Sequence, residues 1–354
     1  MDNILITQNF CYEIDVKLLE ISLQLANRAS LSEENCSSLV NIINNTITNS
    51  NYNIESFPLE YLVHSISNLF SVENRKVFYK IFKIILEIIS RINDTESFIK
   101  ILESSGFLKK LLSIKEINKL EDRTISLLLS IYTNVTMTEN QDFNENLIEM
   151  GILTQLSTLT RNLENERIYF SRIFITLTNI CDSSFKNTLS VFEDGFFHDI
   201  LPVYDYIPSS EKRFEVLVFL TAACQFADFD LTNKLCKLGI MDRFLSTIRF
   251  ETNTNEVNIA LEGLYFILKK GDIRSISSQS FDLSNNIFAE KFNQQDGLKY
   301  LEKYLFSKIE KICILAETIL EEFFNLNTKE YKEQVFTQLE EEKNKQSSEE
   351  EEEV

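Results

Sequence analysis

Apolar residues recur along this chain at helical spacing, in runs separated by short polar turns. The stretch from Leu147 to Cys181 shows the pattern most clearly. It contains an apolar pair, a glycine at Gly151, a short apolar run, a charged turn and a longer apolar run. Apolar positions three or four residues apart give one apolar helical face. This stretch therefore predicts three consecutive helices, and the same order recurs before and after it.

Glycines mark the repeat. Gly106, Gly151, Gly195 and Gly239 are separated by 45, 44 and 44 residues, and each precedes two apolar residues and a short amphipathic run. Glycine accepts the left-handed backbone that ends one helix and turns the chain sharply. A period in the forties with three helices per unit is typical of armadillo repeats. The sequence therefore predicts an all-α, right-handed superhelical armadillo-repeat solenoid of three-helix units.

A longer apolar helix is expected to close each unit, at residues 125–135, 168–181, 214–224 and 257–268. The fifth unit departs from the spacing, because Gly297 follows Gly239 by 58 residues. The extra length falls in GDIRSISSQSFDLSNN, which has few apolar anchors. Such composition favours a loop, so an insertion is predicted at about residues 271–286.

Upstream of this register the pattern is weaker. A helix is expected to start at Leu31–Glu34 and another to span residues 57–69, whereas the Asn-rich and Ser-rich residues 44–53 are predicted to form a loop. Three regions are predicted from the whole chain: diverged N-terminal helical repeats at 1–94, armadillo repeats at 95–327, and a charged helix with a disordered acidic tail at 328–354.

Composition agrees with an all-α fold and narrows the partners. The chain has only 7 Gly and 3 Pro, too few for an all-β or loop-rich scaffold. The formal net charge is −19, and glutamates concentrate at Glu340–Glu342 and Glu349–Glu353. Nucleic acid and anionic membranes need clustered Lys and Arg. Neither is therefore expected as a partner, whereas a basic protein fits this charge.

Location is inferred from three features. None of the six cysteines forms a CxxC pair, so reduced thiols are expected. The first residues lack the basic and apolar segments of a signal peptide. The longest apolar run, Ile84–Ile89, is short and interrupted by Glu87, so no membrane span is expected. These features favour the cytoplasm and nucleus.

Residues that carry catalysis are scarce. Only two histidines exist, His64 and His198, and they are far apart in the chain. The sequence holds no zinc-ligand spacing, glycine-rich phosphate loop or G-x-S-x-G nucleophile motif. We therefore expect no enzyme activity, no metal site and no cofactor.

The C-terminal half resembles a known family. Three stretches carry the resemblance: Asn258–Asp272 (NIALEGLYFILKKGD), Ile287–Leu301 (IFAEKFNQQDGLKYL) and Lys308–Phe324 (KIEKICILAETILEEFF). Their sequence and irregular spacing are similar to importin-α, the armadillo adaptor family that recognises nuclear localisation signals. The resemblance covers about residues 95–325. It implies an adaptor that binds protein cargo and contacts an export receptor through its C-terminal repeats.

In that family the third helix of each repeat carries Trp and, four residues later, Asn. The Asn amide holds the extended cargo backbone and the Trp rings flank lysine stems. In this chain the asparagine positions correspond to Ser90, Asn134, Asn179, Ala222 and Phe266, and the tryptophan positions to Leu86, Ser130, Ile175, Val218 and Glu262. The resemblance therefore implies a peptide-binding groove along these residues.

The chain departs from the family in two ways. It has no Trp, although stacking a lysine stem on an indole is worth roughly 0.5–2 kcal/mol per pocket. Residues 1–60 contain only Lys17 and Arg28 as basic residues, so the family's basic importin-β-binding segment is missing and importin-β is not expected as a partner. One hypothesis is thus an importin-α-like adaptor that binds a protein or a basic localisation peptide for nuclear import. The alternative is an armadillo scaffold or chaperone cofactor without a transport role.

Overall fold

A computed structural model describes residues 17–27, 31–49, 54, 57–70, 75–138, 140–161, 167–250, 253–277 and 286–338. All regular structure within these ranges is helical, and none of these residues lies in a strand. The chain divides into two compact units, Met1–Phe196 and Phe197–Val354. The predicted acidic tail, from residue 339 onward, lies outside the described residues.

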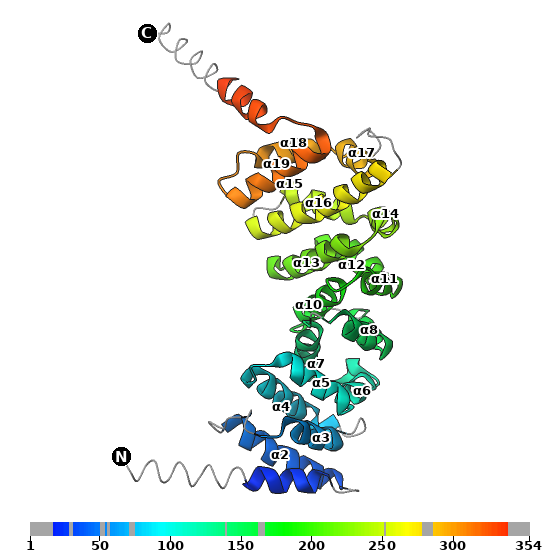
Figure 1. The fold of residues 1–354 in the computed structure, drawn as a ribbon, viewed down its shortest axis with the longest axis vertical. Helices are drawn as coiled ribbons and strands as arrows, with labels where there is room; N and C mark the ends of the chain where they lie inside the picture. The colour runs from blue at the N-terminus through cyan, green and yellow to red at the C-terminus, as the bar shows by residue number, and fades with distance from the viewer. Residues whose placement is uncertain are drawn as a thin grey trace, which may run out of the picture. The chain divides into compact units, whose positions relative to one another are not determined.

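Unit 1 begins with a helix at residues 17–26. Its other helices are α2 (Glu33–Asn49), α3 (Leu59–Leu69), η2 (Arg75–Val77), α4 (Phe78–Arg91), α5 (Thr95–Ser104), α6 (Phe107–Leu112), η3 (Ile117–Lys119), α7 (Asp122–Thr136), α8 (Gln141–Glu149), α9 (Ile152–Thr160), α10 (Phe170–Cys181) and α11 (Phe185–Glu193). Among these, α5–α6–α7 and α8–α9–α10 form two three-helix repeats. The third helices pack in a row, with α2 on α4, α4 on α7 and α7 on α10 (Figure 1).

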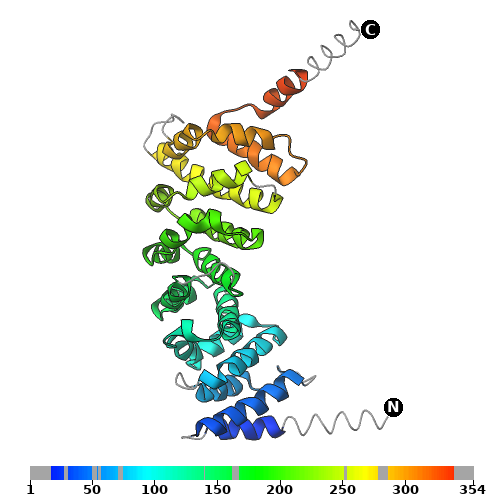
Figure 2. The same ribbon diagram turned by 180° about the vertical axis from the view of Figure 1, so that it is seen from behind.

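The boundary between the units falls within the short helix α12 (Phe196–Ile200). Unit 2 continues with η4 (Leu201–Tyr206), α13 (Ser210–Phe226), α14 (Phe229–Lys237), α15 (Ile240–Phe250), α16 (Thr254–Ser277), α17 (Ile287–Gln294), α18 (Gly297–Tyr304), α19 (Glu310–Phe324) and a helix at residues 328–338. The same row of third helices recurs, because α13 packs on α16 and α16 on α19, and it can be followed from behind in Figure 2.

The predicted turn glycines have the expected conformation. Gly106, Gly151, Gly195 and Gly239 have φ of 71°, 101°, 91° and 97°, the left-handed region that a side chain disfavours. In the last repeat the prediction is wrong by one residue. Asp296 adopts the left-handed turn there (φ 59°), whereas Gly297 begins α18, where an added Cβ would lie 2.5 Å from the Phe292 ring.

The core of each unit is built from the apolar faces of these helices. In unit 1, Phe70 lies with its ring centroid 5.0 Å from that of Phe78 and 5.5 Å from that of Phe107, so α4 and α6 close on one aromatic cluster. In unit 2, Phe197 stacks on Phe219 of α13 at 4.9 Å. Burying such side chains stabilises each unit by about 1.5–3 kcal/mol per residue.

The predicted insertion is only partly a loop. Residues 271–277 continue α16 as helix, so the loop prediction is wrong there, and residues 278–285 lie outside the described ranges. Asn286 ties the end of this segment to α16. Its Nδ2 donates to the Leu268 carbonyl at 2.8 Å, and its Oδ1 accepts from the Phe288 and Ala289 amides.

The predicted loop at residues 44–53 is also wrong in its first part, since α2 runs to Asn49. Two apolar residues at helical spacing, Ile43 and Ile47, are buried and anchor this polar sequence. The Oγ1 atoms of Thr46 and Thr48 donate to carbonyls four residues earlier, so the hydroxyls are satisfied within the helix. Burial of a few residues outweighs the local turn preference of Asn and Thr.

Lysines from one repeat bond the helix ends of the preceding one. The Nζ atoms donate to last-turn carbonyls, from Lys110 to Ser67 of α3, Lys270 to Gln225 of α13, Lys291 to Cys236 of α14 and Lys303 to Ile248 of α15. A cation at a helix C-terminus satisfies orphan carbonyls and interacts favourably with the helix dipole. These bonds fix the spacing between successive repeats within each unit.

Candidate binding face on the third helices

The solvent-facing side of α4, α7 and α10 in unit 1, called here the ladder face, holds the predicted groove positions of this unit. Exposed or half-buried residues recur on these helices at spacings of three and four, which places them on one side of each helix. The equivalent positions are Leu86 and Ser90 on α4, Ser130 and Asn134 on α7, and Ile175 and Asn179 on α10. All six are exposed or half-buried.

Asn134 bonds within its own helix. Its Nδ2 donates to the Ser130 carbonyl at 2.8 Å, one turn earlier on α7. Ser90, at the equivalent place on α4, likewise donates its hydroxyl to the Glu87 carbonyl. The Ser90 hydroxyl hydrogen and one of the two Asn134 amide hydrogens are therefore already used by local backbone, whereas both oxygens can still accept.

Asn179 instead joins two repeats. Its Nδ2 donates to the Thr133 carbonyl at 3.1 Å and lies 3.2 Å from Thr136 Oγ1, both on α7. The described residues offer no hydrogen-bond partner for its Oδ1. The amide thus fixes α10 against the end of α7 and leaves an acceptor directed away from that contact.

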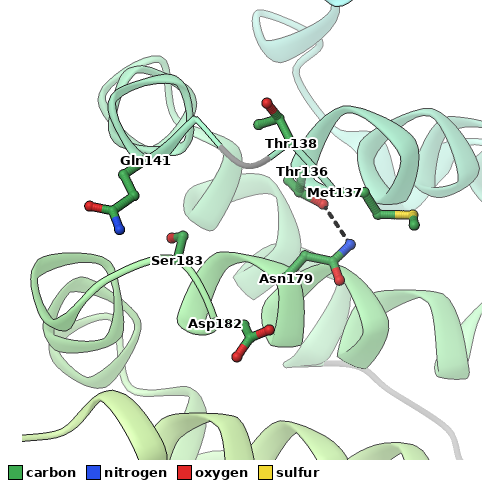
Figure 3. A pocket seen from close by; sticks show the side chains of 7 residues that line it. All are labelled: Thr136, Met137, Thr138, Gln141, Asn179, Asp182 and Ser183. Atoms are coloured by element: carbon green, nitrogen blue, oxygen red, sulfur yellow. Dashed lines mark hydrogen bonds between the residues drawn. The ribbon is translucent and has the colours of Figure 1, made fainter. Parts of the chain in front are cut away.

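A polar hollow of about 400 Å³ surrounds Asn179 (Figure 3). It is lined by the end of α7, the start of α8 and the end of α10, through Thr136, Met137, Thr138, Gln141, Asn179, Asp182 and Ser183. Burial raises the pKa of the Asp182 carboxyl. Met137 is 68 % exposed at the rim. The hollow offers hydrogen-bonding groups and one exposed thioether to a ligand side chain.

The tryptophan positions hold small or aliphatic residues. Leu86 and Ile175 are half-buried, and Ser130 accepts a hydrogen bond from Arg172 Nε at 2.8 Å. A guanidinium from α10 therefore occupies the space beside Ser130. No aromatic ring stands at any of these three positions.

In unit 2 the predicted positions are less open. Val218 is half-buried and Ala222 is only 4 % exposed on α13. Glu262 on α16 accepts a hydrogen bond from Asn258 at 2.8 Å and pairs with Lys311 of α19 at 2.9 Å. Phe266 is half-buried. The acid at Glu262 is thus already neutralised by a lysine of the next repeat.

Three cations on the ladder face were not predicted as site residues. Lys83 on α4 and Arg172 on α10 each stand seven residues before the asparagine position, and Arg123 on α7 stands eleven before it. Within the described part of the chain none has a carboxylate at ion-pair distance. The repeat register could have shown these residues, since counting back from Ser90, Asn134 and Asn179 reaches all three.

A second polar hollow, of about 300 Å³, lies within unit 2 among η4, α13, α15 and α16. Its wall includes Glu256, whose carboxylate is 1 % exposed and 3.6 Å from Arg213 Nε. Ser210 donates its hydroxyl to the same carboxylate. The charge of Glu256 is therefore compensated inside the protein, which is the arrangement of a structural ion pair.

Groups that could bind a metal ion are not brought together in the described ranges. No group of three or more His, Cys, Asp or Glu residues there could hold a metal ion. His64 and His198 are both exposed. Burial raises the pKa of the Cys236 thiol to about 12, so this cysteine is an inert thiol at neutral pH. No described helix is long and apolar enough to cross a bilayer.

Comparison with known proteins identifies the fold. No protein-family model matches the chain, and no curated protein matches it in sequence. Solved structures do match. The designed armadillo repeat protein YIII(Dq)4CqI superposes with a TM-score of 0.58 at 17% identity, over 74% of this chain and 98% of that one.

Two further designed proteins match equally well. The designed armadillo repeat protein YIII(Dq.V1)4CPAF in complex with peptide (KR)4 has a TM-score of 0.60 at 17% identity, covering 75% of this chain and 100% of its own. Computationally designed armadillo repeat proteins for modular peptide recognition give 0.58 at 17% identity, covering 75% and 99%. The predicted all-α armadillo-repeat fold is confirmed. At this identity the likeness concerns the fold alone.

Proposed function

We propose that this chain is a non-enzymatic scaffold that binds an extended segment of a partner protein across the ladder face. The observation that carries the proposal is the register of hydrogen-bonding side chains. Ser90, Asn134 and Asn179 recur at equivalent places on three third helices that pack side by side. An extended peptide presents backbone groups and side chains at regular spacing, so a surface with regular polar positions suits it.

Asn179 supplies the most direct contact in this proposal. Its amide nitrogen is held by α7, which orients its Oδ1 without any partner bound. A fixed acceptor loses little entropy when it meets a backbone N–H. The hollow beside it then receives one side chain of the bound segment.

The fold's other members support the coarser statement. One of the matching designed proteins is described as a complex with a peptide, and another as made for peptide recognition. The same arrangement of three-helix repeats in this chain favours binding of proteins or peptides over catalysis.

Nuclear import of a basic cargo is a narrower form of the proposal, implied by the importin-α resemblance. Asn134 and Asn179 in register favour it. Against it stand the small or aliphatic residues at the tryptophan positions and the cations Lys83, Arg123 and Arg172 on the same face. The scaffold without a transport role is therefore the better-supported form. An export receptor at the C-terminal repeats and residence in cytoplasm and nucleus belong to the import form.

The scaffold is tested by selecting displayed random peptides on the immobilised full chain and titrating an enriched peptide by fluorescence anisotropy. Bulky substitutions on the ladder face, Ser90→Trp and Met137→Trp, should weaken binding by about tenfold, or 1.4 kcal/mol. Lys109→Trp is the matched control, because Lys109 is exposed on the second helix α6. Enrichment of no peptide, or equal binding by all three variants, would contradict the proposal.

The import form has its own test, a titration with a basic localisation peptide and its scrambled counterpart at two salt concentrations. Equal affinity for both peptides would exclude the cargo role while leaving the scaffold intact. Retention of a tagged chain in the cytoplasm when nuclear export is blocked would likewise exclude the import form.

A further inference from the structure

The ladder face carries cationic groups that the rest of the structure does not use. Lys83 is exposed on α4 and Arg123 is exposed on α7. Within the described residues neither has an ion-pair or hydrogen-bond partner. Some other basic side chains of unit 1 are engaged, as in Arg75 with Glu116 at 3.1 Å and Lys186 with Glu145 at 2.5 Å. Cations without partners on a binding face are available to a ligand.

Arg172 is positioned rather than free. Its Nε donates to Ser130 Oγ at 2.8 Å, and Ser130 donates in turn to the Ser126 carbonyl. This chain of bonds fixes the guanidinium over the gap between α10 and α7. Nε is the inner donor of the group, so the two terminal nitrogens remain for a carboxylate, which a guanidinium can bind in bidentate geometry.

Within the helices α4, α7 and α10 themselves, acidic groups are few and already paired. Glu87 on α4 bonds Arg91 at 2.5 Å, one turn later. Asp122, at the start of α7, pairs with Arg167 at 3.1 Å. Asp182 lies at the far end of α10, and burial raises its pKa. Among the described residues of α4, α7 and α10, the half of the face that holds Lys83, Arg123 and Arg172 is therefore locally positive.

We infer that the occupant of the ladder face is an extended acidic segment of a partner protein, with Asp or Glu side chains that meet Lys83, Arg123 and Arg172. This inference rests on the proposed function and specifies its ligand. It reverses the expectation from net charge, under which an acidic chain should take a basic partner. The charge of the binding face itself determines which segment binds, because at physiological salt exposed charges more than about 8 Å apart are largely screened.

The spacing of the cations sets the spacing of the acids. Neighbouring packed helices are about 8–10 Å apart, and Arg123 is displaced by one helical turn, about 6 Å, from the register of Lys83 and Arg172. An extended chain advances about 3.3 Å per residue. Successive cations therefore meet acidic residues three or four positions apart along the segment.

The test titrates the full chain with three labelled peptides of equal length, repeats of Gly-Glu-Ser, Gly-Gln-Ser and Gly-Lys-Ser, followed by fluorescence anisotropy. The acidic peptide should bind about tenfold more tightly than the neutral one, and raising the salt from about 50 to about 300 mM should remove most of that difference. Equal binding of the three peptides overturns the inference.

Charge reversal locates the site. Lys83→Glu combined with Arg123→Glu should weaken acidic-peptide binding by about tenfold or more. The matched control is Lys109→Glu with Lys115→Glu, which makes the same change of charge at exposed residues on α6 and just after it. Equal loss in both double variants, with unchanged thermal unfolding, would show a non-specific charge effect and overturn the inference.

Other occupants give other results. Competition by single-stranded RNA at equal charge concentration would assign the face to nucleic acid. Acidic-peptide binding that appears only when residues 339–354 are removed would assign it to the chain's own glutamate-rich end. Either result overturns the partner assignment. If the peptides selected for the scaffold test bind this face but contain no excess of Asp or Glu, the scaffold stands and the acidic inference fails.

Discussion

Equivalent residues in successive repeats have different bonds in this protein. Asn134 and Asn179 occupy the same repeat position, yet Asn134 bonds its own helix and Asn179 bonds the neighbouring one. The difference arises because Asn179 lies beside the carbonyl of Thr133, in the last turn of α7. A repeat position therefore defines where a side chain stands, and its neighbours define what it bonds.

The glycine turns give a prediction about single residues. Gly151 has φ of 101°, and an added Cβ would meet no atom within 4 Å. The cost of Gly151→Ala is then purely conformational, about 1–2 kcal/mol for a left-handed residue. Gly151→Asn should cost less, since Asn tolerates this region. Urea unfolding of both variants checks the order. Equal midpoints for wild type and Gly151→Ala would contradict it.

Lysine bonds to helix ends show how elements are joined. The Nζ of Lys110 on α6 donates to the Ser67 carbonyl of α3 at 2.5 Å, and burial lowers the pKa of this lysine from its ordinary 10.5. With a lowered pKa in the folded state, the unfolded chain holds the proton more tightly. Protonation therefore costs stability relative to the neutral amine, and this cost shrinks as pH rises from the folded pKa to the ordinary one.

The resulting prediction concerns stability above neutral pH. The free energy of unfolding of the wild type, relative to Lys110→Met, should increase as the pH rises from about 8 toward the ordinary pKa of 10.5. Lys109→Met is the matched control, because Lys109 is the exposed neighbour on α6. Denaturant titrations at several pH values measure the difference. A flat or falling difference for Lys110→Met would refute the linkage.

At the scale of the molecule, a terminal helix stands at the end of the row of helices in unit 2. In unit 2 the helix at residues 328–338 packs on the last repeat. Phe336 meets the Phe306 ring edge-on at 5.8 Å, Tyr331 donates its hydroxyl to Glu302 at 3.1 Å, and Lys332 pairs with Glu317. Phe336 and Phe306 remain 56% and 40% exposed, so this helix covers only a small part of the apolar surface at the end of the solenoid.

Truncation tests this covering role. A chain that ends at Leu326 should lose stability on the order of 1 kcal/mol, because the contact between the Phe336 and Phe306 rings is lost. A chain that ends at Gln338 keeps every described contact and should unfold like the wild type. Phe336→Ser should fall between them. Differential scanning calorimetry compares the three, and equal unfolding of the two truncated chains would show that residues 328–338 contribute nothing.

The order of residues was sufficient to establish the fold of this protein and four of the glycine turns between its helices. The reason is physical: a left-handed turn favours glycine, and a helix that packs on one side needs apolar residues at spacings of three and four. Both demands are local, so they are visible along the chain. Prediction failed at the end of α2, where burial of Ile43 and Ile47 overrode local preference. It also failed at residues 271–277, which continue α16.

The packing of the helices determined the character of the binding face. The sequence located Asn134 and Asn179, but whether an amide is free depends on which carbonyl lies within about 3 Å of it in another helix. The net charge favoured a basic partner, yet the ladder face is lined by Lys83, Arg123 and Arg172. At physiological salt an exposed charge acts on a ligand only over several ångströms, so the charge of the face outweighs the net charge of the chain. Only the packing of the helices decides which polar and charged side chains find a partner within the protein and which remain available to a ligand.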